Sequence, residues 1–277
     1  MLVTSDIIIK NAKSRKIAIG AFNTNNYEFT KAIIDAAEEM NSNVIIQTTQ
    51  NAIKYAGFKT LSNIVRSLAE DSDVKIALHL DHGKELRYVI KAIQHGWTSI
   101  MIDASAYDFE KNVKMTKAVV KIAHEANIPV EAELGPIPKA NTDFKAIYTD
   151  PHQAEEFVNA TDVDFLAVAI GNAHGIYKNP HPQLNVDVLK EIRKRVDVPL
   201  VMHGGSGLPN DQIKLAIKNG ITKINIDTEL RIAFSSAIEN YFKSNPESYS
   251  IRRYLSLGMD AVKEKVKEKI SLFRLEK

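Results

Sequence analysis

The chain has 277 residues, of which 44% are hydrophobic and 25% are charged, and its formal net charge is only +2. These proportions are typical of a globular enzyme with one large core, and so small a charge argues against binding to nucleic acid or to an anionic membrane, which usually requires a clustered basic face. The absence of cysteine excludes disulfides and thiolate ligands, so a transition metal here would be bound by histidine and carboxylate.

Short segments rich in β-branched residues alternate with longer amphipathic segments along the whole chain. This alternation predicts the strand–helix units of an α/β fold, and eight strands are the number that closes a (β/α)8 TIM barrel. Because no segment has the composition of a linker, we expect one barrel domain over residues 1–277. The expected strands are 17–22, 44–48, 74–80, 99–103, 130–134, 165–170, 200–203 and 223–227. The helices expected between them include 28–40, 60–70, 85–95, 108–126, 187–195 and 210–219.

The N-terminal segment MLVTSDIIIK has neither a long apolar core nor a small-residue cleavage site, so we do not expect a secretory signal peptide. No apolar run approaches the roughly 20 residues that a membrane-spanning helix requires. These two observations predict a cytoplasmic protein that does not associate with membranes.

The expected strands end at polar residues or at glycine. In a TIM barrel, the carboxyl ends of the strands meet at one rim, and catalytic residues come from several of these ends. Randomly scattered polar residues would not select the same end of every strand, so an active site is expected at this rim. The strand-end residues are Asn23, Thr48, Asp81, His82, Asp103, Glu133, Gly171, Asn172, His203 and Asp227.

Three histidines, His82, His174 and His203, each follow a strand-like segment and are each followed by glycine. Three imidazoles around an open coordination position are a common arrangement for catalytic zinc, and glycine allows close backbone approach and positive φ. We therefore expect these three residues to bind Zn2+. Asp103 and Glu133 are candidates for alternate metal ligands or for acceptors of a hydrogen bond from His82, and capping of the following helix is an equally good role for Asp103.

Asp81 directly precedes His82, and two roles are open for it. It could orient the metal-binding imidazole, or it could act as a general base and acid beside a metal-polarised substrate. Adjacent residues leave a strand in different directions, which favours the second role.

Strand alternation places Glu131 and Lys223 inside the barrel, one layer below its mouth. A structural ion pair is the favoured interpretation, because a buried charge needs a partner. Lys223 would then lie too low to form a Schiff base with a substrate at the rim.

Residues suited to phosphate binding follow the seventh and eighth expected strands. The loops after these two strands usually form the phosphate site of this barrel, with backbone N–H groups at a helix N-terminus. Lys178 would add a positive charge. The expected donors are Gly204, Gly205, Ser206, Gly207 and Thr228.

Seven motifs occur in order along the chain: AFNxxNxE (21–28), HLDHG (79–83), SxMIDAS (99–105), VEAELG (130–135), AIGxAHGxYK (169–178), PLVxHGGSG (199–207) and KINIDTEL (223–230). Their combination resembles the class II, zinc-dependent ketose-bisphosphate aldolases, over residues 18–252. The resemblance implies a homodimeric or homotetrameric barrel that acts as an aldehyde-lyase. It would cleave fructose 1,6-bisphosphate to dihydroxyacetone phosphate and glyceraldehyde 3-phosphate through a zinc-stabilised enediolate, with tagatose 1,6-bisphosphate as a close alternative substrate.

The same resemblance assigns roles to individual residues. It makes His82, His174 and His203 the zinc ligands, Asp81 the group that transfers the proton of the C4 hydroxyl, and Asp103 and Glu133 part of an alternate metal position. Arg252 matches an arginine that reaches the second phosphate, often of the neighbouring subunit. Backbone carbonyls around Gly175, Gly204 and Ser206 match a site for Na+ or K+. The positions expected to contact the phosphorylated sugar are Asn23, Thr49, Gly175, Lys178, Gly204, Gly205, Ser206, Asn225, Asp227, Thr228 and Arg252.

The sequence departs from the family pattern in the loop PIPKANTDFKAIY (136–148), which lacks the glutamate that exchanges the proton on the enediolate carbon. Asp143 is the nearby carboxylate and the candidate substitute. Two prolines in place of glycines predict a stiffer loop. Thr49 replaces the usual serine, and Ser250 and Ile251 replace Asp-Pro before Arg252.

These departures leave a further alternative open, a catalytically impaired homologue that binds zinc and a phosphosugar. A metal-dependent hydrolase on the same barrel is disfavoured. Such enzymes commonly carry a His-x-His pair at the first strand, where this chain has IAIGAFN.

Overall fold

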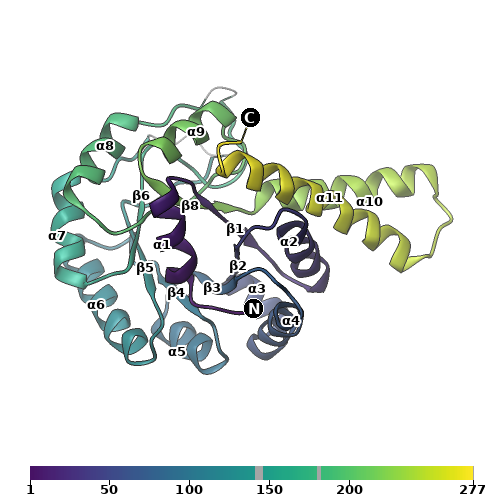
Figure 1. The fold of residues 1–277 in the computed structure, drawn as a ribbon, viewed down its shortest axis with the longest axis horizontal. Helices are drawn as coiled ribbons and strands as arrows, with labels where there is room; N and C mark the ends of the chain where they lie inside the picture. Colours follow the sequence, from purple (N-terminus) through teal and green to yellow (C-terminus); the bar gives the residue numbers. More distant parts are fainter. Residues whose placement is uncertain (141–145, 180–181, 277) are drawn as a thin grey trace.

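The computed structural model describes residues 1–140, 146–179 and 182–276. Eight parallel strands form a closed barrel in sequence order, with the first strand paired to the eighth, so the predicted (β/α)8 barrel is confirmed (Figure 1). The strands are β1 (Ile19–Asn23), β2 (Val44–Thr49), β3 (Ile76–Gly83), β4 (Ser99–Ile102), β5 (Val130–Leu134), β6 (Phe165–Val168), β7 (Leu200–Met202) and β8 (Ile221–Ile226).

Several strand boundaries differ from the prediction. β3 extends to Gly83, whereas its predicted end was residue 80. β1 begins at Ile19 rather than at residue 17, because the N–H of Ala18 is donated to the carbonyl of Phe273 instead of to a neighbouring strand. Local residue preference sets where a strand is favourable, but pairing with distant segments sets where it begins and ends.

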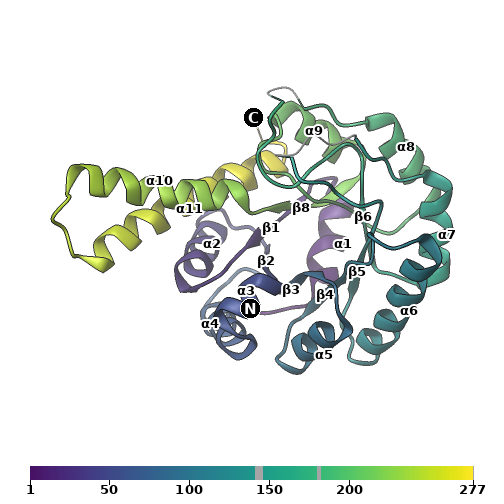
Figure 2. The same cartoon turned by 180° about the vertical axis from the view of Figure 1, so that it is seen from behind.

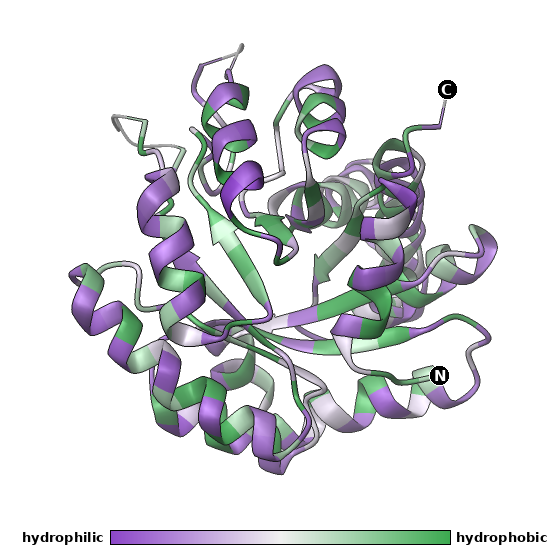
Figure 3. Ribbon diagram, turned by 60° about the vertical axis from the view of Figure 1, so that its left-hand side comes forward, coloured by the Kyte–Doolittle hydropathy of each residue, from purple (hydrophilic) through white to green (hydrophobic). Residues whose placement is uncertain are grey.

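The helices between the strands cover the outside of the barrel. Their inward faces pack on the strands in a continuous apolar layer, and Figure 3 shows mainly hydrophobic strands inside helices of mixed polarity. Several of these helices begin with a side-chain cap. At the start of α7, the Asp150 side chain accepts from the backbone N–H groups of His152 and Gln153, and Pro151 occupies the first helical position. The helices are α2 (Tyr27–Glu39), α3 (Gln50–Ala56), α4 (Phe58–Glu70), α5 (Leu86–Gln94), α6 (Phe109–Glu125), α7 (Pro151–Thr161), α8 (Val186–Arg195) and α9 (Asn210–Lys218).

The N-terminal helix α1 (Ser5–Arg15) lies across the amino end of the barrel (Figure 1). Its Ile8 and Ile9 are fully buried against apolar side chains of the barrel interior, including Phe165 and Val201. This helix closes the end of the barrel opposite the rim where the strands terminate, so ligands can reach the interior from that rim.

The last two helices, α10 (Thr228–Ser244) and α11 (Ile251–Phe273), form a hairpin that projects from the side of the barrel (Figures 1 and 2). α11 packs against α10 and α2. The hairpin leaves large apolar side chains exposed, among them Tyr249, Ile251 and Ile232. In the described part of the chain, no helix is long and apolar enough to cross a membrane.

Candidate active site

A cavity of about 470 Å³ opens at the carboxyl ends of the strands. The last residues of β1, β2, β3 and β8 and the segments that follow β5, β6, β7 and β8 contribute to its wall. The structure therefore brings together residues that are far apart in the sequence, as expected for the active rim of a TIM barrel. The predicted site residues that line the cavity are Asn23, Thr49, Asp81, His82, His174, Gly175, Gly204, Ser206, Asn225, Asp227 and Thr228.

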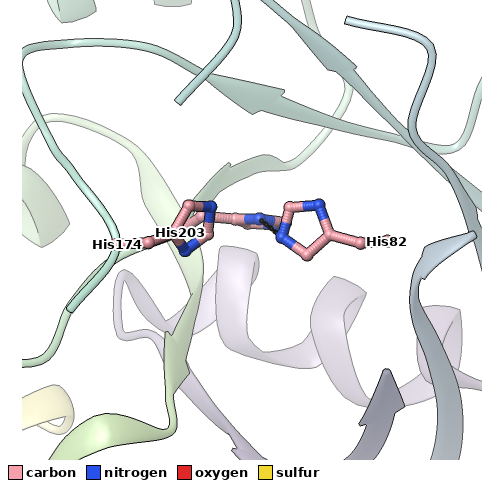
Figure 4. Close-up of side chains that lie close together, drawn as sticks. All are labelled: His82, His174 and His203. Atoms are coloured by element: carbon pink, nitrogen blue, oxygen red, sulfur yellow. Dashed lines mark hydrogen bonds between the residues drawn. The ribbon is translucent and has the colours of Figure 1, made fainter. Parts of the chain in front are cut away.

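The side chains of His82, His174 and His203 converge at this rim (Figure 4). One ring nitrogen from each lies within 4.8 Å of the others, and the ring centroids are 4.7, 4.9 and 5.8 Å apart. His82 lies near the end of β3, His174 lies in the loop after β6, and His203 directly follows β7. Three imidazole nitrogens that can approach one ion meet the ligand number of a catalytic zinc site.

Hydrogen bonds to carboxylates orient two of these rings. His82 Nδ1 lies 2.8 Å from Asp103 Oδ2, and His203 Nε2 lies 2.8 Å from Glu131 Oε1. Each carboxylate takes the N–H of its ring, so the lone pairs of His82 Nε2 and His203 Nδ1 remain, and these two atoms face each other at 3.1 Å. Two facing lone pairs repel unless a proton or a metal ion lies between them, so this pair of nitrogens can bind a metal ion in place of a shared proton.

The charges around the histidines favour a cation as well. Burial alone would lower the pKa of His82, but Asp81, Asp103 and Glu133 raise it to about 9. Burial raises the pKa of Glu133 to about 7. Its Oε2 atom has no hydrogen-bond partner within the described residues and lies 3.5 Å from His203 Nδ1. An unpartnered carboxylate oxygen beside the three imidazoles is a further potential ligand.

His174 and His203 are held in the neutral form that a metal ligand requires. Burial, followed by the positive charge of His82, lowers the pKa of His174 to about 4 and that of His203 well below its ordinary value.

A local irregularity in β3 directs both Asp81 and His82 into the cavity. The register between β3 and β4 shifts between Leu80 and Gly83, and His82 has a φ of +50°. A Cβ atom at Gly83 would overlap the carbonyl oxygen of Met101, so only glycine allows this close approach. The bulge explains how two adjacent residues of one strand face the same site.

Asp81 is buried and is held by side-chain amides. Its Oδ2 accepts from Asn23 Nδ2 at 3.0 Å, and its Oδ1 accepts from Asn225 Nδ2 at 3.3 Å. Burial acts to raise the pKa of Asp81, but His82 and other positive groups outweigh it and hold this pKa below its usual value. An ionised carboxylate beside the ligand site has the geometry of a general base.

The orienting role left open for Asp81 belongs to Asp103, since Asp103 accepts the N–H of His82. The alternative that Asp103 caps the next helix is wrong, because Asp108 is the N-cap of α6 and accepts from the N–H of Lys111.

The predicted phosphate site requires a correction. The N–H of Gly205 is donated to the carbonyl of Asn225, and the N–H of Gly207 is donated to Glu229 Oε1. Neither N–H is available to a phosphate, and neither glycine lines the cavity. Ser206 and the N-terminal residue of α10, Thr228, do line it.

Two further predicted residues lie away from the cavity. Lys178 is exposed on the loop after β6 and does not line the cavity. Arg252 lies in the first turn of α11, at the outer end of the hairpin and away from the cavity of its own chain (Figure 1). Asp143 lies outside the described residues.

Two cationic residues of the cavity were not predicted. Arg231 lies one turn after Asp227 and forms a 2.8 Å ion pair with it. The four-residue spacing on a helix was the available signal. Lys139 comes from the loop after β5, where no sequence pattern indicated its direction.

The loop that carries Lys139 also supports a histidine. The N–H of His174 is donated to the carbonyl of Pro138, and the carbonyl of His174 accepts from the N–H of Ala140, both at 2.8 Å. The loop that departs most from the family pattern therefore holds the backbone of one of the three convergent histidines.

Comparison with known proteins agrees with this geometry. A sequence model described as class-II fructose-bisphosphate aldolase matches residues 3–277. A fructose-bisphosphate aldolase from Thermus caldophilus is 42% identical over 300 residues, covering 99% of this chain and 98% of the relative. One from Geobacillus stearothermophilus is 42% identical over 278 residues, covering 98% and 96%. The crystal structure of the YdjI aldolase from Escherichia coli K12 is similar with a TM-score of 0.89 at 42% identity, covering 99% and 97%.

Proposed function

This chain belongs to the class-II fructose-bisphosphate aldolase family, and we propose that it cleaves fructose 1,6-bisphosphate reversibly to dihydroxyacetone phosphate and glyceraldehyde 3-phosphate. It is thus an aldolase, a lyase. The observation that carries the proposal is the convergence of His82, His174 and His203 beside Asp81, at the wall of one cavity that Asp81, His82 and His174 line. The two relatives at 42% identity bear the name of this activity.

The three histidines would bind zinc through His82 Nε2, His203 Nδ1 and a ring nitrogen of His174. A bound zinc ion supplies Lewis-acid stabilisation of the negative charge that cleavage of the C3–C4 bond leaves on the dihydroxyacetone phosphate half. Asp103 and Glu131 would keep two of the rings in the required tautomer.

Asp81 would accept the proton of the C4 hydroxyl during cleavage and return it during condensation. Asn23 and Asn225 hold its carboxylate for this step. Gly204, Ser206 and Thr228 would contact the phosphate of the dihydroxyacetone half at the N-terminus of α10.

The proposed site also includes a position for a monovalent cation and a contact from Lys139. Carbonyl groups around Gly175, Gly204 and Ser206 would hold Na+ or K+. Lys139, on the wall formed by the β5 loop, would contact the anionic end of the substrate.

The second phosphate would be bound by Arg252 of a neighbouring subunit in a homodimer or homotetramer. The exposed apolar residues of the projecting hairpin, including Tyr249 and Ile251, support an interface there, because neighbouring exposed apolar side chains commonly mark association surfaces.

Tagatose 1,6-bisphosphate is the alternative substrate. It differs from the fructose isomer in configuration at C4, the carbon whose hydroxyl would meet Asp81. The catalytically impaired binding protein is the second candidate function, and the missing glutamate of loop 136–148 favours it.

A coupled assay of the zinc-loaded protein with both bisphosphates tests these proposals, with triose phosphate release as the readout. Faster cleavage of the fructose isomer would support the proposal, and faster cleavage of tagatose bisphosphate would favour the alternative. Binding of zinc and dihydroxyacetone phosphate without cleavage of either sugar would indicate the impaired homologue. Activity that persists in excess EDTA would overturn the metal mechanism.

A further inference from the structure

A fully buried lysine lies directly beneath the proposed metal site. Lys223, on β8, has an exposed fraction of 0% and does not line the cavity. Its Nζ atom lies 2.9 Å from Glu131 Oε2 and donates to Asn225 Oδ1 at 2.8 Å. The predicted ion pair of Lys223 with Glu131 is thus confirmed. Burying two charges is costly, so a pair that serves stability alone could be replaced by apolar side chains.

Glu131 connects this ion pair to His203, one of the proposed metal ligands. Glu131 Oε1 lies 2.8 Å from His203 Nε2 while its Oε2 faces Lys223. An imidazole that donates its Nε2 proton to a carboxylate presents the Nδ1 lone pair at its other edge. The Glu131 carboxylate therefore selects the tautomer in which His203 Nδ1 faces the metal position.

A second imidazole, that of His79, lies near Glu131 without a hydrogen bond to it. His79 Nδ1 bonds to Ser99 Oγ, which itself accepts from Ser5 Oγ. The Ser99 proton is then directed at His79 Nδ1, which leaves His79 with its proton on Nε2, 3.8 Å from Glu131 Oε2. The groups that Glu131 contacts directly are therefore His203 at Oε1 and Lys223 at Oε2.

Lys223 connects the ion pair to Asp81 through the side chain of Asn225. Asn225 Oδ1 accepts a hydrogen bond from the Lys223 ammonium, so the NH2 group of Asn225 must point toward Asp81. There, Asn225 Nδ2 donates to Asp81 Oδ1 at 3.3 Å. Without that ammonium the Asn225 amide could rotate and present its oxygen to the carboxylate.

We propose that Lys223 and Glu131 are a positioning pair that sets both the tautomer of His203 and the orientation of the Asn225 amide beside Asp81. One buried ammonium thereby couples the metal half of the site to the proton-transfer half. The inference rests on the proposed zinc aldolase function, which gives the two orientations their use.

The variant Glu131→Gln tests the metal side with little change in shape. An amide has one oxygen, which Lys223 holds, so its NH2 group faces His203 Nε2 and drives the proton to Nδ1. Zinc affinity, measured by competition with a chromogenic chelator, should fall by about 10–100-fold. In ¹⁵N spectra of the metal-free protein, His203 should change from the Nε2–H to the Nδ1–H tautomer. A Ser5→Ala variant, altered at the far end of the same buried chain, should bind zinc as the wild type does.

The double variant Glu131→Gln/Lys223→Met removes both charges and separates the two roles. Without the Lys223 ammonium, the oxygen of the amide introduced at residue 131 can turn and accept from His203 Nε2. His203 Nδ1 then faces the metal position again, so zinc affinity should recover toward the wild-type value. The kcat for fructose 1,6-bisphosphate should stay about tenfold low with KM little changed, because Asn225 is no longer anchored.

Wild-type zinc affinity and an unchanged His203 tautomer in folded Glu131→Gln would overturn the proposal. So would a double variant that binds zinc no better than Glu131→Gln, or one with wild-type kcat. A wild-type protein that binds no zinc would refute the proposed function instead, and the tautomer spectra, recorded without metal, would still test the pair.

Discussion

Gly204 follows the proposed zinc ligand His203 and takes a φ of +66° where the loops after β6 and β7 meet. A Cβ atom here would overlap the backbone carbonyl oxygen of Ala173, which precedes the proposed ligand His174. In Gly204→Ala, the left-handed backbone costs about 1–2 kcal/mol and the forced displacement about 1–3 kcal/mol. The free energy of unfolding should therefore fall by about 2–5 kcal/mol.

Gly207→Ala is the matched control. Gly207 lies in the same loop with a φ of +78°, but the nearest atom to a Cβ there is Tyr177 Cδ2 at 3.4 Å, an ordinary contact. This variant should lose only the backbone component, about 1–2 kcal/mol. Urea unfolding of the metal-free proteins measures both, and zinc titration should show weaker binding for Gly204→Ala alone. Equal losses of stability in the two variants would refute the argument that Gly204 is required for close approach.

Three further predictions concern single side chains. Asp103→Asn should weaken zinc binding by about 10–100-fold, because Ser105 donates to Oδ1 and leaves the amide nitrogen facing His82. Isothermal titration calorimetry measures the zinc affinity, and an unchanged affinity would contradict the orienting role of Asp103. Asp81→Asn should lower kcat by about 10²–10⁴-fold in the coupled assay while zinc affinity is retained, and loss of zinc instead would make Asp81 a metal-positioning residue. Lys139→Met should raise KM for the bisphosphate about tenfold with a smaller effect on kcat, and an unchanged KM would remove Lys139 from substrate binding.

The barrel and the position of its active rim could be predicted because both follow from periodic features of the sequence. Strand and helix segments alternate along the chain, and polar residues mark the same end of each strand. The ion pair between Glu131 and Lys223 was predictable for the same reason, since strand alternation places both inside the barrel.

Contacts that depend on irregular backbone or on distant partners could not be predicted. The bulge in β3 and the positive φ of His82 have no signal in the residues HLDHG beyond the glycine. The hydrogen bond from the Gly207 N–H to Glu229 Oε1 depends on how α10 packs against the preceding loop. The link from Glu131 to His203 needs the angular placement of β5 and β7 around the barrel, which the order of strands alone does not specify.

Helix α1 shows the same limit at the other end of the barrel. Its sequence did not indicate that Ile8 and Ile9 would close the barrel, because that role depends on the width of the opening formed by all eight strands.

The central claim is that this chain cleaves a ketose bisphosphate with one zinc ion bound by His82, His174 and His203. The most direct test adds zinc stepwise to EDTA-stripped protein while triose phosphate release from fructose 1,6-bisphosphate is recorded. Activity should rise from the background rate and level off at one zinc per chain, and a His174→Ala variant should show no such rise. Full activity in the stripped protein, or a zinc-dependent rise that survives in His174→Ala, would contradict the account.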